Sequence, residues 1–168
     1  MLTTSTSANS PRRRSTTRRR WRPEGSRLPC ARNCLRPTRN STPDAKPALE
    51  ALKGAGAQLA ILSNGSPAML ESAIRAAGLD GLFDAVLSVD ARQVFKTAPT
   101  VYTLATEHFD VDAGEVSFQS SNRWDIAAAS LFGFRAVWIN RAGLPDEYPD
   151  MAPAAVLRGL DELPGLPD

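Results

Sequence analysis

Ser120-Ser121-Asn122-Arg123-Trp124-Asp125 is the stretch that decides the predicted fold, because it separates an apolar segment at 116–119 from a run of small residues at 126–129. The apolar segment reads as a strand and the small residues as part of a helix. In open α/β folds, ligands bind beyond the carboxyl ends of parallel strands, where this polar stretch would stand. Ser, Asn and Asp also satisfy free N–H groups at helix starts, so a purely capping role is an equal alternative.

Two other strand-like segments end in polar groups and favour a site over a cap. The segment 58–62 runs into Ser63 and Asn64, and the segment 85–89 leads to Lys96. Three successive strands would therefore bring hydroxyl, amide, ammonium and carboxylate groups to one edge of a parallel sheet.

Strand-like and helix-like segments alternate along this part of the chain. The near-continuous apolar character of the strands fits parallel strands covered on both faces. The alternation predicts an α/β fold with a doubly wound parallel sheet. The apolar residues after Arg141 offer one further helix or strand. The expected strands are 58–62, 85–89, 116–119 and 136–140, and the expected helices are 43–53, 67–77, 100–108 and 126–132.

Charge divides the chain into two predicted parts. The net charge is only +2 over 168 residues, but residues 1–46 hold 11 Arg and one Lys against two acidic residues. Residues 47–168 hold 8 basic and 16 acidic residues. High like charge and low hydrophobicity cannot repay the entropy of ordering, so 1–42 is predicted to be a disordered basic leader and 43–168 the folded part. An arm that binds nucleic acid is a less favoured alternative for the leader than a solvated charge run.

The cysteine and histidine content argues against a metal site. Cys30 and Cys34 have no further Cys or His nearby, since the single His108 lies far along the chain, and a closed zinc site needs four ligands. No metal or cofactor is therefore expected. The leader contains no continuous apolar run of the kind found in a secretory signal or a membrane helix. Two reduced thiols and no signal favour a cytoplasmic location.

Three motifs in order resemble those of a known family. Leu62-Ser63-Asn64-Gly65, then Val94-Phe95-Lys96, then the stretch 120–125 are similar to motifs two, three and four of the haloacid dehalogenase superfamily. The form Ser-Ser-Asn-x-x-Asp, with Val137-Trp138-Ile139-Asn140-Arg141 beyond it, resembles the (S)-2-haloacid dehalogenases in particular. The resemblance covers roughly residues 43 to 164 and implies a Rossmann-like core. It also implies a hydrolase that displaces halide from C2 of a 2-haloacid through an aspartyl ester.

The resemblance implies catalytic roles for four residues. Lys96 would keep the attacking carboxylate ionised by placing a positive charge beside it. Ser120 would hydrogen-bond the substrate carboxylate or the nucleophile, and Asn122 and Asp125 would orient the nucleophile and the hydrolytic water. The structural alternative for Lys96 is an ordinary solvated surface lysine.

The resemblance implies substrate-binding roles for four more residues. Ser63 would hydrogen-bond the substrate carboxylate or the nucleophile, and the Asn64 amide would donate to the departing halide. Tyr102 and Trp124 would reach the same site. In the structural alternative, Ser63 and Asn64 only cap a helix at 67, and Tyr102 and Trp124 only pack.

The first motif of the family, an apolar strand that ends in the nucleophilic aspartate and leads to a cap, has no counterpart in residues 1–46. Asp44 is the only aspartate before the predicted sheet. The resemblance places the missing strand between 58–62 and 116–119, so a truncated core without dehalogenase activity is expected. For residues 1–42 an out-of-frame or wrongly started translation is the favoured account, and a genuine basic arm or a remnant of a decayed gene stays open.

Alternatives within the superfamily stay open. Phosphatases of this fold place two acidic residues in motif four for Mg²⁺, whereas Ser121 and Asn122 stand early in this one, which favours metal-free dehalogenation. The expected partner is a small 2-haloacid, with no nucleic acid or membrane, and a homodimer is left open.

Overall fold

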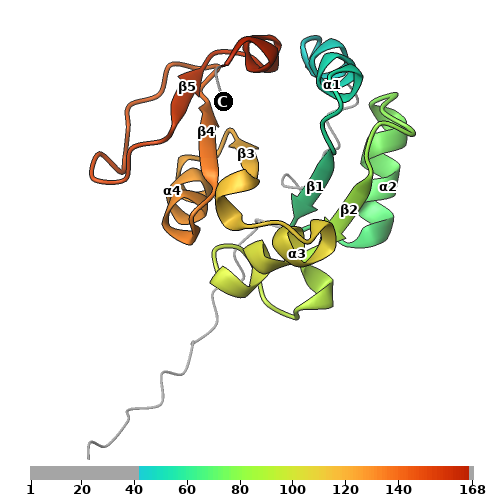
Figure 1. Ribbon diagram of the computed structural model, residues 1–168, viewed down its shortest axis with the longest axis horizontal. Coiled ribbons are helices and arrows are strands. Elements are labelled where there is room, and N and C mark those ends of the chain that lie inside the picture. Colours follow the sequence, from blue (N-terminus) through green and yellow to red (C-terminus); the bar gives the residue numbers. More distant parts are fainter. Residues whose placement is uncertain (1–41, 167–168) are drawn as a thin grey trace, which may run out of the picture. The chain divides into compact units, whose positions relative to one another are not determined.

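The computed structural model describes residues 42–166, in which helices and strands alternate (Figure 1). The predictions for residues 1–41, including Cys30 and Cys34, lie outside the described residues. Among residues 42–166, no helix combines the length and the apolar character needed to cross a membrane. The α-helices are α1 (Ala45–Gly54), α2 (Pro67–Ala76), α3 (Pro99–Phe109) and α4 (Arg123–Phe132). The strands are β1 (Ala60–Ser63), β2 (Ala85–Ser88), β3 (Ser117–Ser120), β4 (Arg135–Ile139) and β5 (Ala155–Leu157), and short 3-10 helices are η1 (Val89–Ala91), η2 (Ala113–Glu115) and η3 (Leu160–Gly165).

The strands form two separate sheets rather than one. β1 pairs with β2, and the second sheet has the order β3-β4-β5; every pairing is parallel. The predicted α/β fold with parallel strands is confirmed, and the sheet is interrupted where the strand of the first motif was expected to be missing. Among the described residues, β1 has no strand on the side away from β2, and β3 has none on the side away from β4. These two open sides match the place where the resemblance puts the strand of the first motif.

The start of α4 differs from the prediction. The helix begins at Arg123, three residues before the expected start at 126, because Asn122 already has the extended backbone of a helix cap. The polar residues read as a turn therefore include the first turn of the helix. The helix ends at Gly133, whose φ of 109° is a conformation that residues with a Cβ atom rarely adopt. The tail after Arg141, for which one element was expected, forms both β5 and η3.

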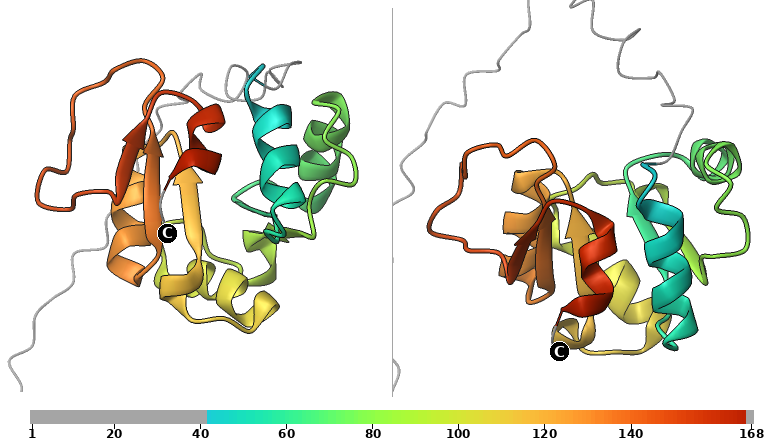
Figure 2. Two further views of the ribbon diagram at one scale, coloured as in Figure 1. Left: turned by 45° about the horizontal axis from the view of Figure 1, so that its top comes forward. Right: turned by 90° about the horizontal axis from the view of Figure 1, so that it is seen from above.

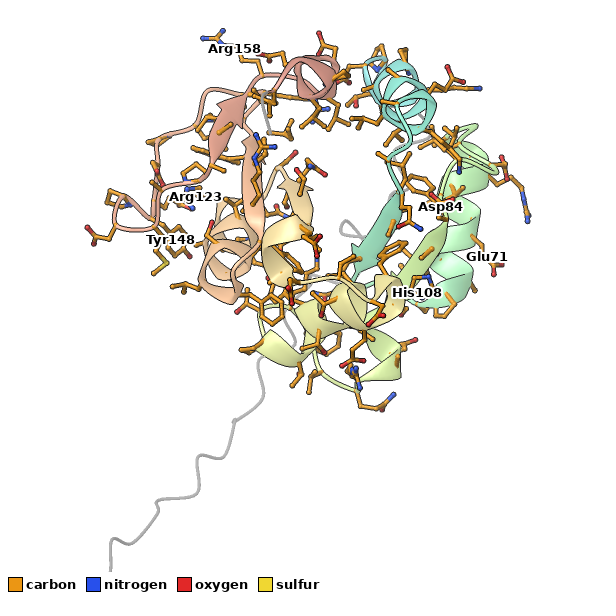
Figure 3. All side chains as sticks on the ribbon, in the orientation of Figure 1. Glu71, Asp84, His108, Arg123, Tyr148 and Arg158 are labelled. Carbon is orange, nitrogen blue, oxygen red and sulfur yellow. The ribbon has the colours of Figure 1, made fainter. Side chains whose placement is uncertain are left out.

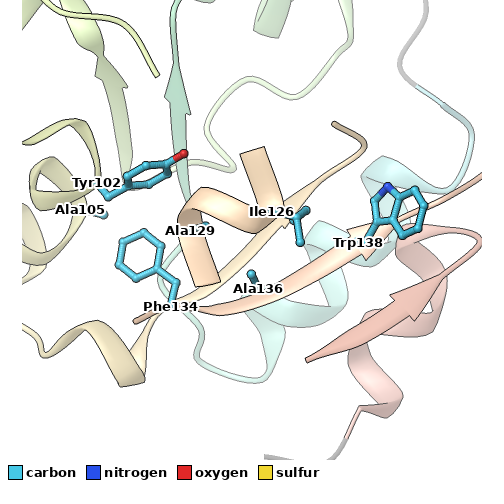
Figure 4. Close-up of a cluster of buried hydrophobic side chains, with 7 residues drawn as sticks. All are labelled: Tyr102, Ala105, Ile126, Ala129, Phe134, Ala136 and Trp138. Atoms are coloured by element: carbon cyan, nitrogen blue, oxygen red, sulfur yellow. The ribbon is translucent and has the colours of Figure 1, made fainter. Parts of the chain in front are cut away.

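An aromatic cluster forms the main core of the second sheet (Figure 4). Tyr102 on α3 and Phe134 before β4 lie at one end of the cluster, and Trp138 on β4 lies at the other. β4 is the central strand and is buried along its length after the first residue, whereas β1 and β3 have no fully buried residue. Burial thus falls off towards the two open sides of the sheets.

Asp44 joins the start of α1 to the second sheet. Its Oδ2 accepts hydrogen bonds from the Leu160 N–H at 2.7 Å and from Arg141 Nη2 at 2.7 Å. α1 also packs against η3, the short helix that begins at Leu160 (Figure 2). Burial by itself raises the pKa of the Asp44 carboxyl, but hydrogen bonds from Thr42, Leu160 and Arg141 outweigh burial and hold that pKa well below its usual value. The only aspartate before the sheets is therefore an anchor between α1 and η3.

Replacing Asp44 with Asn is expected to lower the free energy of unfolding by about 1–3 kcal/mol at pH 7, because two hydrogen bonds lose their charged acceptor. A carboxyl whose pKa is lowered by folding stabilises the protein above its unfolded pKa of about 3.9, and this stabilisation is lost as the pH falls through the folded value. The difference between the wild type and D44N should therefore shrink as the pH is lowered below about 4. Urea unfolding at pH 7 and pH 3 measures both effects. The control is Glu50→Gln in the exposed pair with Lys46, which should change stability by less than about 0.5 kcal/mol; an equal loss in both variants would contradict the anchoring role.

Candidate active site

Polar side chains gather at the carboxyl ends of the strands. Ser63 is the last residue of β1 and Ser120 the last of β3, while Lys96 lies in the connection from β2 to α3. Asp125 stands on the first turn of α4, directly after β3. In parallel sheets this edge is the usual place for ligands.

Asp125 connects two of the predicted residues. Its Oδ2 lies 3.0 Å from Lys96 Nζ, and its Oδ1 accepts a hydrogen bond from the Tyr102 hydroxyl at 2.8 Å. Both oxygens of the carboxylate are thus held by donors from segments more than twenty residues earlier in the chain. The three side chains thus join the segment after β2, which carries Lys96, to α3, which carries Tyr102, and to α4, which carries Asp125.

The Lys96–Asp125 pair is buried. The exposed fraction of the side chain is 8% for Lys96 and 4% for Asp125. The alternative that Lys96 is a solvated surface lysine is therefore wrong. Two buried charges compensate each other only when their geometry is good. Removing one of them leaves the other buried without a counter-ion.

Tyr102 is fully buried within the aromatic cluster. Burial raises the pKa of its hydroxyl well above the usual value, and the hydrogen bond to Asp125 raises it further. The hydroxyl therefore stays protonated and donates to the carboxylate. Tyr102 has both a packing role and a contact with Asp125, and its contact with substrate stays a prediction.

Asn64 is fixed by the backbone of Lys96. Its Oδ1 accepts the Lys96 N–H at 2.9 Å, although the two residues are 32 positions apart in the chain. Since the carbonyl side of the amide is used in this way, the NH₂ group is the part that remains to donate to a ligand.

Ser63 does not cap the following helix. Its Oγ accepts the Gly65 N–H at 3.1 Å, while Ser66 caps α2 by accepting the Met69 N–H at 3.4 Å. The alternative that Ser63 and Asn64 merely cap this helix is therefore wrong. The Ser63 hydroxyl has accepted one hydrogen bond and retains its own hydrogen.

Ser120 repeats this arrangement at the end of β3. Its Oγ accepts the Asn122 N–H at 3.1 Å. The Asn122 side chain makes no capping hydrogen bond to α4 and is exposed. Trp124 is 39% exposed, and both its contact with substrate and the alternative that it only packs stay predictions.

Ser88 supports the site and was not identified from the sequence. It is buried at the end of β2, donates to the Gly65 carbonyl at 2.8 Å and accepts the Asp90 N–H at 3.2 Å. Ser88 thereby ties the turn that contains Asn64 to the neighbouring strand. The signal that could have identified Ser88 is its position as a polar residue at the end of a predicted strand, beside the strand that leads to Ser63 and Asn64.

Arg123 was also missed, although it lies within the stretch that decides the fold. It is 4% exposed; its Nε donates to Asp146 Oδ1 at 2.6 Å, and its Nη2 donates to the carbonyls of Tyr148 and Met151, each at 2.6 Å. The guanidinium also faces the rings of Trp138 and Tyr148; Figure 3 labels Arg123 and Tyr148. Arg123 therefore holds the loop after β4 against the start of α4.

Comparison with known proteins gives one consistent family. Residues 30–133 match the family described as haloacid dehalogenase-like hydrolase. The (S)-2-haloacid dehalogenase 1 of Pseudomonas sp. (strain CBS-3) is 47% identical over 124 residues, which are 74% of this chain and 55% of that protein. The crystal structure of the L-2-haloacid dehalogenase RSc1362 superposes with a TM-score of 0.73 at 48% identity, over 75% of this chain and 56% of that one. The L-2-haloacid dehalogenase from Xanthobacter autotrophicus superposes with a TM-score of 0.68 at 37% identity, over 74% of this chain and 59% of that one.

The match is partial in length. The chain spans about half the length of the curated relatives that it matches. The matched part includes the three ordered motifs and the parallel strands that carry them. This chain belongs to the haloacid dehalogenase-like hydrolases.

Proposed function

We propose that this chain supplies the supporting half of a 2-haloacid dehalogenase site, in which hydrogen-bond donors surround an attacking carboxylate and its substrate. The observation that carries the proposal is the set of groups left free at the carboxyl edge. The hydroxyls of Ser63 and Ser120 each accept a backbone N–H, and neither donates to an acceptor within residues 42–166. Asn64 retains its NH₂ group, and Lys96 has three N–H donors, of which one faces Asp125.

These donors fit a reaction in which the nucleophile, the substrate and the departing halide all carry negative charge. A carboxylate oxygen attacks C2 of the haloacid, the carbon–halogen bond breaks, and halide leaves with the bonding electrons. Water then attacks the carbonyl carbon of the ester and the bond from that carbon to the substrate oxygen breaks. One proton of the water ends on the hydroxyl of the released 2-hydroxyacid, the other passes to solvent, and the carboxylate is regenerated. Lys96 would stabilise the ionised nucleophile, the two serines would bind the substrate carboxylate, and Asn64 would donate to the departing halide. Asn122 and Asp125 would orient the nucleophile and the water, and Trp124 and Tyr102 would bound the substrate.

A phosphatase of the same superfamily is the second candidate, since phosphate is also an anion. The chemistry of Asp125 argues against it. Magnesium prefers carboxylate oxygens, but both oxygens of Asp125 already accept hydrogen bonds from Lys96 and Tyr102. The nucleic-acid-binding arm, which was the less favoured alternative, falls in residues outside the described part and stays untested, as does a homodimer. The cytoplasmic location stays a prediction.

Binding of substrate without turnover is expected for the full chain. Adding (S)-2-chloropropionate should shift the backbone amide NMR signals of Ser63, Asn64 and Ser120, while halide release stays at the uncatalysed rate. The physical reason is that, among the described residues, the carboxylate paired with Lys96 is Asp125, whose two oxygens are both occupied.

The matched control uses two serines of the same strand. Ser120→Ala should remove the shifts, whereas Ser117→Ala, at the opposite end of β3, should retain them. Shifts that persist in S120A, or halide release by the full chain at the rate of an intact relative, would contradict the proposal. Binding of phosphate in preference to the haloacid, and only with Mg²⁺, would favour the phosphatase.

A further inference from the structure

The Lys96 ammonium is held from a second side by an aromatic ring. Lys96 Nζ lies 4.8 Å from the centre of the Phe118 ring, within the range of a cation–π contact, while it also pairs with Asp125. Phe118 stands on β3 two residues before Ser120, so the two side chains share one face of the strand. The ring therefore lies beside the lysine on the side of the sheet that carries the Ser120 hydroxyl.

The Phe118 ring is itself fixed by its neighbours. It packs edge-on against Tyr102, with ring centres 5.9 Å apart, and in a tilted arrangement against Phe134 at 5.9 Å. Tyr102 in turn donates its hydroxyl hydrogen to Asp125, which pairs with Lys96. Phe118, Lys96, Asp125 and Tyr102 thus form a closed circuit in which each side chain contacts the next.

We propose that Phe118 is a positioning residue for Lys96. The negative face of the ring holds the ammonium at the carboxyl edge, so that one N–H points to Asp125 and the other two are available for an incoming anion. A leucine at this position would fill similar space but would present no negative face to the ammonium. The proposal rests on the proposed function only for the identity of that anion.

The full chain provides its own standards for a test, because it contains three lysines, Lys46, Lys53 and Lys96. Trace labelling of lysines with acetic anhydride, followed by peptide mass spectrometry, gives the reactivity of Lys96 relative to Lys46. Phe118→Leu is expected to raise this relative reactivity about five- to thirtyfold, the range that corresponds to the loss of a cation–π contact of about 1–2 kcal/mol. Phe118→Tyr, which keeps an aromatic face, should stay within about twofold of the wild type.

A second readout detects the ring directly. The ε-methylene protons of Lys96 should resonate upfield of those of Lys46 in the wild type, because they lie near the face of a ring. This shift should vanish in F118L and persist in F118Y. A wild-type Lys96 signal at the position of the Lys46 signal would overturn the proposal even if F118L failed to fold.

Phe132→Leu is the matched control, since Phe132 belongs to the same aromatic cluster and contacts Tyr102 and Phe134. It makes the same change of side chain without removing the ring that faces Lys96. If F132L raises the reactivity of Lys96 as much as F118L does, general loosening explains the effect and the proposal fails. Neither readout uses a haloacid, so a failure of the proposed function leaves this test intact.

Discussion

Joining residues 43–168 to the first strand and cap of an intact relative is expected to produce an enzyme that releases halide from (S)-2-chloropropionate. A parallel strand placed between β1 and β3 would hydrogen-bond both open sides and end at the edge that holds Lys96 and Ser120. It would also cover the half-buried residues Leu62 and Phe118, each Å² of apolar surface contributing roughly 25 cal/mol. The fusion should therefore unfold more cooperatively than the chain alone in a thermal melt.

Activity of the fusion should depend on Lys96. Replacing it with Met is expected to lower halide release by roughly two to three orders of magnitude, because loss of a preorganised charge beside the reacting group costs about 3–4 kcal/mol. Lys53→Met is the matched control: its ammonium contacts the Leu82 carbonyl and Asp84, away from Asp125. A well-folded fusion that releases no halide would count against the dehalogenase assignment. Cleavage of phosphate esters that requires Mg²⁺ would support the phosphatase instead.

Replacing Asp125 with Ala is expected to destabilise the full chain by about 3–5 kcal/mol, since it leaves a buried ammonium without its counter-ion. The Tyr102 hydroxyl would lose its carboxylate acceptor at 2.8 Å in the same step and keep only the longer contact with the backbone carbonyl of residue 125 at 3.5 Å. Urea unfolding monitored by circular dichroism measures the loss.

The control for this effect removes both charges together. The double variant K96M/D125L should recover most of the lost stability, because apolar side chains of similar size can replace a buried ion pair at little cost. A loss below about 1 kcal/mol in D125A, or no recovery in the double variant, would contradict the burial of the pair.

The sequence predicted the residues at the strand ends better than it predicted their partners. Alternation of apolar and polar segments is local information, so the positions of Ser63, Lys96 and Ser120 at one edge followed from it. The contact between Tyr102 and Asp125 joins residues 23 positions apart, and helical spacing indicates which face is buried without indicating what that face meets. The gap between the two sheets, by contrast, lies where the resemblance to the family places the missing strand.

Arg123 is a second example of a contact that local sequence does not indicate. It occupies a variable position of the motif and carries a charge, both of which suggest a solvent-exposed side chain. It is buried because a loop that follows twenty residues later brings one carboxylate and two carbonyl groups to the guanidinium. Nothing in the residues next to Arg123 encodes that loop.

The open sides of β1 and β3 also affect how the chain behaves in concentrated solution. An unpaired strand edge presents a row of free N–H and C=O groups that can template pairing with another molecule. Proteins with exposed edges usually place charged residues or proline there, but Ala60–Ser63 and Ser117–Ser120 contain neither. Edge-to-edge association of copies is therefore expected to compete with folding as the concentration rises.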